Sequence, residues 1–407
     1  MTLLFLLQMN QNNLSKILFA NAHSLFDYTD GASNSIRLIL ERLSLLGHEV
    51  FVVTGLISNG LDGFNYSKEF FKNDLNNEIK RFKKNGINFS LVKTKQWQRL
   101  QLSSIEQELI YRETESIIKK NNINLIIGWG NLLLEESIFK KAKDNNIKIC
   151  FYLVSPSYKG KKIFLMKNSD FAITDSQSTL NLYKNEYSKP IFVLPKFLAK
   201  CPKNNIKNIN KKSRYKCLFV NPIIKKGLEP FILICHFANK NEMPLDFICI
   251  DSNNNLINEL SLLNFDANQL PPNIKIKRSQ INNYELFRDI DILLLPSLWH
   301  ESGSRLIYEA YSYGIPVIGF NTGGTAELIG EFKKNLFDSP KVYFDNNYIL
   351  RLHNWEPNGI CKRIFEIIND YKNESEEIKR FYKNLDLDMH CNKKLNEIIN
   401  FVDNNNS

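Results

Sequence analysis

Two acidic residues, Glu301 and Glu309, stand out as candidates for chemistry in the stretch SLWHESGSRLIYEAYSYGIPVIGF, residues 297–320. The first comes directly before an amphipathic segment, and the second lies inside it. A glycine and a proline then end the segment before an apolar run of strand length. The run DILLLPS, residues 291–297, predicts another strand immediately upstream. In a parallel α/β sheet, ligands bind where such a strand ends and its loop leads into a helix.

The loop between this strand and the helix contains backbone amides that suit a phosphate and a carboxylate that suits sugar hydroxyls. Gly303, between Ser302 and Ser304, lets a ligand approach the backbone, and the free amides at a helix N-terminus attract an anion. A carboxylate there does not suit a phosphate, so we expect Glu301 to accept hydrogen bonds from neutral hydroxyls. Glu309 could do the same for a second set of hydroxyls, although alone it would also fit an ordinary solvated glutamate. Together the groups predict a nucleotide-sugar site.

Length and charge restrict the class of protein. A chain of 407 residues suits two domains of roughly 150–200 residues each. The net charge of +10 has two interpretations: an anionic partner such as a nucleic acid, a nucleotide or an acidic membrane surface, or a diffuse abundance of lysine. We favour the diffuse charge, because no arginine-rich block with interleaved aromatic residues is present. We therefore expect no nucleic-acid partner, and leave contact with a membrane surface open.

The cysteines and the first residues bear on the compartment. The chain has 7 cysteines and no CxxC pair, which favours a reducing compartment over a disulfide framework or a zinc site. Cys150, Cys217, Cys235 and Cys249 lie in apolar runs and are expected to be small buried residues. The opening run MTLLFLL is too short to span a bilayer, which takes about 20 apolar residues. We expect a cytoplasmic protein that starts at Met1 or Met9.

Strand-like runs alternate with helical patterns along most of the chain. KILFANA (16–22) and EVFVVTG (49–55) flank a helical stretch (34–47) that ends on glycine, which indicates a βαβ unit and a parallel sheet. A polar segment at 200–214 is the best linker candidate, and the pattern restarts at YKCLFVN (215–221). Further strands are expected at 124–130, 147–154, 170–176, 191–195, 245–250 and 274–277, and helices at 105–120 and 227–240. This order predicts an α/β fold of two doubly wound domains that face a cleft.

The segment HESGSRLIYEAYSYGIPVIGFNTGGTAELI, residues 300–329, resembles the E-x7-E signature of GT-B glycosyltransferases, in particular the glycosyl transferases group 1 (family 4) enzymes. FVNPIIKKGLEPFI (219–232) resembles the first strand and loop of the family's C-terminal domain. DGASNSIRLILERLSLLGHEVFVVTG (30–55) resembles its N-terminal glycine loop, helix and second strand. The matching positions of the signature are Glu301, Gly303, Glu309, Ala310, Gly314, Pro316, Val317, Gly323, Gly324 and Glu327.

The resemblance implies a role for each matching group. Glu301 would bind the donor sugar hydroxyls, Glu309 the ribose and Lys226 the diphosphate, so that Glu301 and Lys226 carry the catalysis. The amides around Ser302, Gly303 and Ser304 would assist. A loop with Gly31, Ala32 and Ser33 would approach the phosphate and the acceptor from the other domain. Such enzymes usually retain the anomeric configuration and need no metal or other cofactor, because cationic side chains and helix ends neutralise the leaving diphosphate.

The resemblance also implies two GT-B domains with Rossmann-like folds. Residues 1–199 would bind the acceptor, residues 215–375 would bind the nucleotide-sugar, and the helical tail 376–407 would pack back toward the first domain. The chain departs from the family at two points. Lys225 is the only extra cation before Lys226, where an arginine is common, and no histidine follows the fourth or fifth strand of the first domain. His23 is expected to be a loop residue.

Two alternatives to a glycosyltransferase stay open. One is a nucleotide-sugar epimerase that acts without an acceptor, and the other is a relative that binds nucleotide but does not catalyse. The intact set of Glu301, Lys226 and Glu309 argues against the second. A dinucleotide oxidoreductase is disfavoured because no G-x-G-x-x-G follows KILFANA, and a P-loop is absent. The donor base, the donor sugar and the acceptor, whether carbohydrate, lipid or small molecule, are not specified.

Overall fold

The computed structural model describes residues 14–74, 76–161, 163–198, 212–278 and 283–404. The chain divides into two compact units. Unit 1 consists of Met1–Phe197 and Asp388–Ser407, and unit 2 of Leu198–Leu387. The two candidate start residues and most of the predicted linker at 200–214 lie outside the described residues.

Unit 1 is built on one sheet with the strand order β3-β4-β2-β1-β5-β6-β7-β8 among its described residues. Every pairing from β4 through β8 is parallel, and only β3 joins antiparallel, to β4. The strand order reverses between β1 and β5, because the chain adds strands first on one side of β1 and then on the other. The strands are β1 (Lys16–His23), β2 (Glu49–Ile57), β3 (Ile79–Lys84), β4 (Ile87–Val92), β5 (Leu125–Gly128), β6 (Lys148–Tyr152), β7 (Phe171–Thr174) and β8 (Ile191–Val193).

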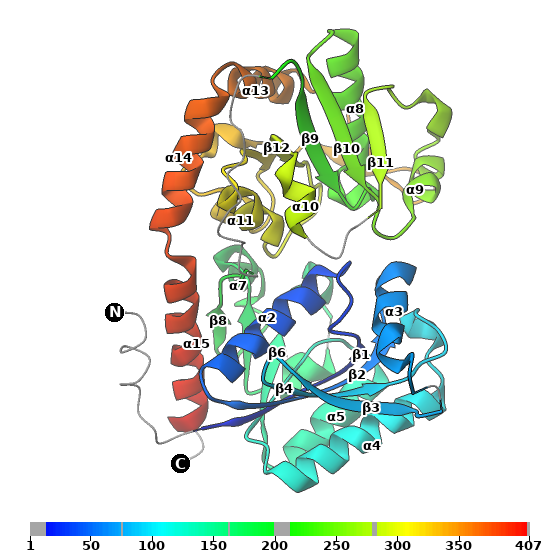
Figure 1. Cartoon of the computed structure of the whole chain (residues 1–407), viewed down its shortest axis with the longest axis vertical. Coiled ribbons are helices and arrows are strands. Elements are labelled where there is room, and N and C mark those ends of the chain that lie inside the picture. Colours follow the sequence, from blue (N-terminus) through cyan, green and yellow to red (C-terminus); the bar gives the residue numbers. More distant parts are fainter. Residues whose placement is uncertain (1–13, 75, 162, 199–211, 279–282, 405–407) are drawn as a thin grey trace. The chain divides into compact units, whose positions relative to one another are not determined.

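Helices connect the parallel strands of unit 1 and cover both faces of its sheet. Helix α2 lies on one side, and α4 and α5 lie on the other (Figure 1). The terminal helix α15 (Leu387–Asn404) belongs almost entirely to this unit, where Asp388 accepts a hydrogen bond from Arg42 at 2.8 Å. The other helices are α2 (Gly31–Leu45), α3 (Leu61–Lys68), η1 (Glu69–Phe71), η2 (Arg99–Gln101), α4 (Ser104–Asn121), α5 (Leu133–Asp144), η3 (Pro156–Tyr158), α6 (Phe164–Asn168) and α7 (Gln177–Tyr183).

Unit 2 contains a parallel sheet with the order β11-β10-β9-β12-β13-β14 among the described residues. This is the doubly wound order 3-2-1-4-5-6, and its direction reverses between β9 and β12. A separate antiparallel pair, β15 and β16, follows. The strands are β9 (Tyr215–Val220), β10 (Leu245–Ile250), β11 (Ile274–Lys277), β12 (Ile292–Leu295), β13 (Val317–Phe320), β14 (Leu336–Phe337), β15 (Val342–Phe344) and β16 (Leu350–Leu352).

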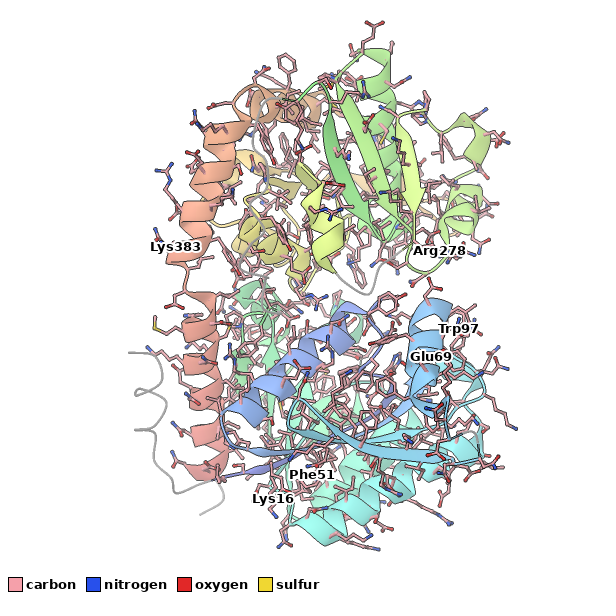
Figure 2. The ribbon with its side chains drawn as sticks, viewed as in Figure 1. Lys16, Phe51, Glu69, Trp97, Arg278 and Lys383 are labelled. Carbon is pink, nitrogen blue, oxygen red and sulfur yellow. The ribbon has the colours of Figure 1, made fainter. Side chains whose placement is uncertain are left out.

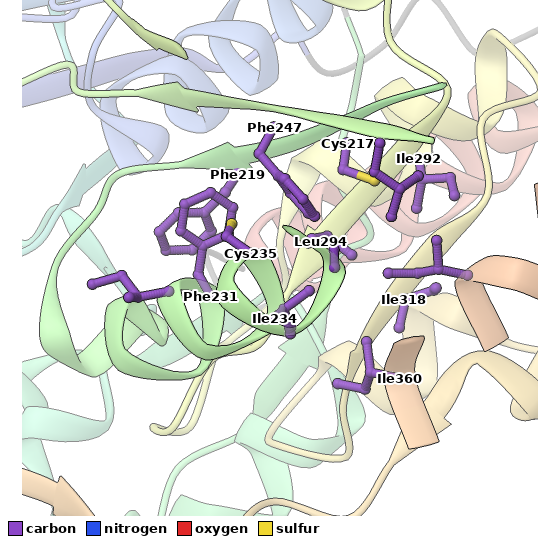
Figure 3. Packing of buried hydrophobic residues seen from close by; sticks show 14 of the residues in the cluster. Cys217, Phe219, Phe231, Ile234, Cys235, Phe247, Ile292, Leu294, Ile318 and Ile360 are labelled. Carbon is purple, nitrogen blue, oxygen red and sulfur yellow. The ribbon is translucent and has the colours of Figure 1, made fainter. Parts of the chain in front are cut away.

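One core cluster of unit 2 forms where helix α8 packs on this sheet. The Phe231 ring of α8 stacks on Phe219 of β9 at 4.4 Å between ring centres and meets Phe247 of β10 edge-on, while Cys235 lies beside them (Figure 3). The helices of the unit are η4 (Ile224–Lys226), α8 (Leu228–Lys240), α9 (Leu256–Leu262), η5 (Ala267–Gln269), α10 (Asn283–Arg288), α11 (Arg305–Ser312), α12 (Thr325–Ile329), η6 (Lys333–Asn335), α13 (Asn358–Asn369) and α14 (Tyr371–Asn384). Figure 2 shows how side chains fill the space between sheet and helices in each unit.

The predicted fold class is confirmed, since both units are doubly wound α/β structures with mainly parallel sheets. The four cysteines that were expected to be buried, Cys150, Cys217, Cys235 and Cys249, are buried free thiols, and burial raises the pKa of each. Within the described ranges, we find no helix with the length and apolar composition of a membrane span.

Candidate functional site

Strand β12 positions the first loop of the site. It ends at Leu295, and helix α11 begins at Arg305, so Glu301, Ser302, Gly303 and Ser304 lie in the connecting loop as predicted. Ser304 is the N-cap residue, but its side chain makes no capping hydrogen bond. The N-terminal amides of α11 are therefore not satisfied by this side chain, and a helix N-terminus of this kind favours an anion.

Strand β9, the neighbour of β12, positions the second loop. The chain turns through η4 and reaches Gly227 with a φ of +93°, in the left-handed region that favours glycine. A Cβ at Gly227 would fall 1.8 Å from the carbonyl oxygen of Pro296, so the two loops touch at this point. The amide of Leu298 donates to the carbonyl of Lys225 at 2.9 Å, and the Oγ of Ser297 lies 3.3 Å from the same carbonyl oxygen. Both loops start where the strand order reverses, which is the usual ligand position in such sheets.

Lys226 and Glu301 form an ion pair across the two loops. The Lys226 Nζ donates to Oε1 of Glu301 at 2.6 Å. The hydroxyl of Ser297 and the indole N–H of Trp299 donate to the same oxygen, at 3.0 and 3.2 Å. Burial, the largest single influence, acts to raise the pKa of Glu301, but the lysine charge and the three donors together hold this pKa below its ordinary value. Glu301 is therefore an ionised carboxylate with its cation beside it.

A third segment, after β13, supports the backbone of Glu301. The amide of Gly324 donates to the carbonyl of Glu301 at 2.6 Å. Gly323 has a φ of +54°, and a Cβ at this position would lie 2.2 Å from the same carbonyl oxygen. The pair of glycines in the signature is thus explained by close backbone contact with the loop that carries the carboxylate.

A small cavity of about 40 Å³ lies beside the ion pair, and its lining includes Lys226, Ser297, Glu301, Ser304 and Thr325. The hydroxyl of Thr325 is buried, and no group in the described part of the chain forms a hydrogen bond with it. A space of this size accommodates a small polar group or a water molecule.

The second glutamate has a partner of its own. Glu309 lies in the second turn of α11, and its Oε1 is 2.8 Å from Nε of Arg305. Both side chains are largely buried, with exposed fractions of 12% and 14%. The structure thus brings Lys226 and Glu301 into direct contact and places Glu309 on the helix that follows the loop, paired with a residue whose role the sequence left undefined.

Unit 1 differs from the expectation at Gly31 and Ala32. These residues form the first turn of helix α2 rather than a loop. The reason is the side chain of Asp30, which accepts a hydrogen bond from the amide of Ser33 at 2.7 Å and caps the helix. A Cβ at Gly31 would meet nothing within 4 Å, so the space beside this turn is open.

His23 also differs from the expectation, because it is the last residue of β1 and not part of a loop. It continues the strand by pairing with Ile57 of β2 after an irregularity in the register. Burial, together with the charge of Arg99, lowers the pKa of His23 against the opposing effect of Asp30.

Three further residues of the site, Ser297, Trp299 and Thr325, were not predicted from the sequence. All three lie in or next to the matched signature, in SLWHE and GGTAE. Serine and tryptophan before the glutamate carry donors, but only the fold shows that both reach the same carboxylate oxygen. In the described part of the chain, no three or more histidine, cysteine, aspartate or glutamate side chains lie together where they could hold a metal ion.

Comparison with known proteins agrees with this geometry. Residues 204–352, which include both loops, match the family described as Glycosyl transferases group 1. No curated protein matches the sequence significantly. The resemblance predicted from the signature is confirmed by the family match together with the structures described next.

Several solved structures have the same fold. A glycosyltransferase from Rickettsia africae ESF-5 is 16% identical, with a TM-score of 0.60 over 96% of this chain and 98% of that one. Anabaena Alr3699/HepE in complex with UDP-glucose is 13% identical, with a TM-score of 0.64 over 95% and 99%. WaaG, a glycosyltransferase involved in lipopolysaccharide biosynthesis, is 12% identical, with a TM-score of 0.60 over 94% and 99%. At these identities the likeness shows the fold, which is GT-B.

Proposed function

We propose that the chain transfers a sugar from a nucleotide-sugar to a hydroxyl-bearing acceptor. Residues 204–352 match the glycosyl transferases group 1 family, and the chain has the GT-B fold. One observation carries this proposal. The Lys226–Glu301 pair lies where the strand order of unit 2 reverses, in the loop that leads into the N-terminus of α11. A cation, a carboxylate and helix amides at one point suit a ligand that has both phosphates and sugar hydroxyls.

Each group has one role in the proposed reaction. An ammonium group has three N–H donors, and the structure uses one of those of Lys226 for Glu301, so the others are available to diphosphate oxygens. The amides around Ser302, Gly303 and Ser304 would share the diphosphate charge. Glu301 would accept hydrogen bonds from sugar hydroxyls, and Glu309 from the ribose. Charge that develops on the leaving diphosphate would then meet positive groups already in place.

We propose that the reaction retains the anomeric configuration and needs no divalent metal, because Lys226 and the helix amides supply the positive charge. Gly31 and Ala32, beside the open space at the start of α2, would contact the acceptor in unit 1. The acceptor is a carbohydrate, a lipid or a small molecule with a free hydroxyl. EDTA should leave turnover unchanged, and a full loss that Mg²⁺ or Mn²⁺ restores would contradict metal independence. Proton NMR of the anomeric position in donor and product would test retention.

The cytoplasm is the proposed compartment, since Cys150, Cys217, Cys235 and Cys249 are buried as free thiols. We also propose contact with an anionic membrane surface, which a net charge of +10 favours even when the charge is diffuse. Sedimentation with vesicles of phosphatidylglycerol, and with vesicles of phosphatidylcholine as the neutral control, would test this contact. Equal recovery of the protein with both would contradict it.

A thermal-shift screen with UDP, GDP, ADP and their glucose conjugates would test the donor class, because a ligand that binds only the native state raises its melting temperature. We expect one nucleotide series to stabilise the protein and Lys226→Met to abolish the shift. Lys334→Met is the matched control, because Lys334 forms a similar pair with Glu374 at 2.8 Å, also in unit 2. A shift that Lys226→Met leaves intact would refute the assigned site. Conversion of the donor to an isomer without an acceptor would instead identify an epimerase.

A further inference from the structure

The three donors to Glu301 are distributed unevenly over its two oxygens. The Lys226 Nζ, the Ser297 Oγ and the Trp299 Nε1 all donate to Oε1. Among the described residues, no donor reaches Oε2 of this carboxylate. One oxygen is therefore saturated by the protein, whereas the other keeps its lone pairs for a ligand.

Trp299 also contacts the neighbouring loop. The ammonium group of Lys225 lies over its ring, 5.6 Å from the ring centre, while the indole N–H points at Glu301. The backbone carbonyl of Lys225 accepts a hydrogen bond from the amide of Leu298 at 2.9 Å, and the Ser297 Oγ lies 3.3 Å from it. The side chains that hold the carboxylate thus also join its loop to the loop that carries Lys226.

We propose that Trp299 and Ser297 are positioning residues, which hold one oxygen of Glu301 so that the other faces a hydroxyl of the donor sugar. This inference rests on the proposed function for the identity of the ligand, but the positioning itself depends only on the contacts within unit 2. Without these donors, Lys226 alone would hold Glu301, and a single charged contact leaves the carboxylate free to rotate. Lys226 would then have to fix the carboxylate and bind the diphosphate at once.

A titration of Glu301 tests the positioning without any ligand. The protein is labelled with ¹³C at the glutamate carboxyl carbons, and Glu301→Gln identifies the Glu301 signal. Trp299→Phe keeps the ring beneath Lys225 and removes only the N–H donor, and Ser297→Ala removes only a hydroxyl. Because a hydrogen bond to a charged group is worth about one pH unit or more, we expect each change to raise the titration midpoint by about one unit.

Three controls separate positioning from a general structural effect. Ser297→Thr keeps a hydroxyl and should restore the wild-type midpoint. Trp355→Phe changes another tryptophan of unit 2, which packs edge-on against Phe320, and should leave the midpoint unchanged. If Trp299→Phe proves unstable, Ser297→Ala still decides the result. Unchanged midpoints in both Trp299→Phe and Ser297→Ala would overturn the proposal.

A calorimetric comparison of UDP with UDP-glucose connects the positioning to the sugar. Trp299→Phe should weaken the binding of UDP-glucose about tenfold and the binding of UDP less than twofold, because only the sugar is bound through Glu301. Equal weakening of both ligands would contradict a role toward the sugar. If the wild type binds no UDP, GDP or ADP conjugate of glucose, the proposed function fails, and the titration still reports on the positioning alone.

Discussion

The two points where the strand order reverses, between β9 and β12 in unit 2 and between β1 and β5 in unit 1, have different chemistry. In unit 2 the loops there carry the Lys226–Glu301 ion pair beside a small cavity. In unit 1 the side chain of Asn21 bridges the ends of the two strands by donating to the carbonyl of Trp129 at 2.8 Å. The Trp129 ring then packs on Phe19 at 5.1 Å between ring centres. The same topology therefore carries an ion pair beside a small cavity in unit 2. In unit 1 the strand ends are bridged by an amide and packed with aromatic rings, next to the buried ion pair of Arg99 and Glu135 at 2.8 Å.

One carboxylate in each unit, Asp27 and Glu301, has a pKa shifted from its ordinary value, and the two shifts have opposite directions. Asp27, in the loop after β1, is 1% exposed and accepts hydrogen bonds from the amides of Thr29 and Asn59, at 2.9 and 2.7 Å. Burial and then the nearby charge of Asp30 raise its pKa to about 6. Glu301 is also buried, but its cation lowers its pKa. Asp27, which is held mainly by amides, thus joins two loops, whereas Glu301, beside a cation, stays charged and available to a ligand.

The largest effect is expected from Lys226→Met, because it removes the cation that distinguishes the site in unit 2. Turnover should fall about 100- to 1000-fold, as is typical when a group that stabilises developing charge is lost. Steady-state kinetics with the nucleotide-sugar found in the thermal-shift screen would measure this. Lys334→Met should stay within twofold of the wild type. Near-normal turnover of Lys226→Met would show that the ion pair in unit 2 does not distinguish its strand-order reversal from that of unit 1.

The pH dependence of stability should have opposite signs for the two carboxylates. The folded pKa of Asp27, about 6, lies above its ordinary value of 3.8. The stability that Asp27 contributes is therefore fully present below pH 3.8 and is lost as pH rises through 6, by about 2–3 kcal/mol between pH 4 and 7. The Glu301 contribution is present above its ordinary pKa of 4.5 and is lost as pH falls through its lower folded pKa.

Denaturant unfolding of the wild type, Asp27→Asn and Glu301→Gln across this pH range would measure both contributions. The difference in free energy of unfolding between wild type and Asp27→Asn should shrink as pH rises. The corresponding difference between wild type and Glu301→Gln should shrink as pH falls. Differences with the same pH slope in both variants would show that the two environments are not distinct.

A substitution at Gly323 should act on the site through the backbone. Gly323→Ala places a methyl group 2.2 Å from the Glu301 carbonyl oxygen at a φ of +54°, so the loop must shift. We expect a loss of about 2 kcal/mol in the free energy of unfolding, measured by urea denaturation, together with weaker binding of the sugar nucleotide. Gly31→Ala is the matched control, since it adds the same methyl group in open space in the first turn of α2. Its stability should be unchanged or slightly higher.

The smallest effect is expected from Glu309→Gln, which should weaken the free nucleoside diphosphate about tenfold through loss of a charge-assisted hydrogen bond to the ribose. Glu301→Gln should leave the affinity for the free diphosphate nearly unchanged and depress turnover instead, because the sugar is no longer oriented. Calorimetric titration of both variants would separate them. Equal losses for the free diphosphate would refute this division of roles.

The sequence was sufficient to predict a feature where the role of a residue depends on its neighbours along the chain. The apolar strands were identifiable from the hydrophobic pattern, and the signature positions and the lysine before Gly227 from the resemblance to the family. It was insufficient where the role of a residue depends on contacts between segments that are far apart in the chain. Trp299 could have been an ordinary half-buried aromatic residue, and only its position relative to Lys225 and Glu301 shows its role. Glu309 looked solvated or ribose-binding, whereas the fold gives it Arg305 as a partner.

One wrong prediction and one omission had local signals in the sequence that were not used. Asp30 before GASN is a typical N-cap, so the helix start at Gly31 was predictable from the sequence. The Asn85–Gly86 pair joins β3 to β4, with φ values of 50° and 81°, which is the strongest short signal for a β-hairpin. In both places a capping or turn residue fixes the backbone more firmly than the hydrophobic pattern around it.

The edge strand β3, with the sequence IKRFKK, has a consequence for the behaviour of the protein in concentrated solution. It pairs with β4 on one side and ends the sheet of unit 1 on the other, so its outer backbone could pair with a strand of another molecule. Two such strands brought together would set lysines against lysines and arginines, and like charges across a ladder repel. The positive charges of β3, which form part of the net charge of +10, therefore oppose aggregation through this edge. Replacing Lys83 and Lys84 by threonine should lower the solubility of the protein without changing either loop of the site.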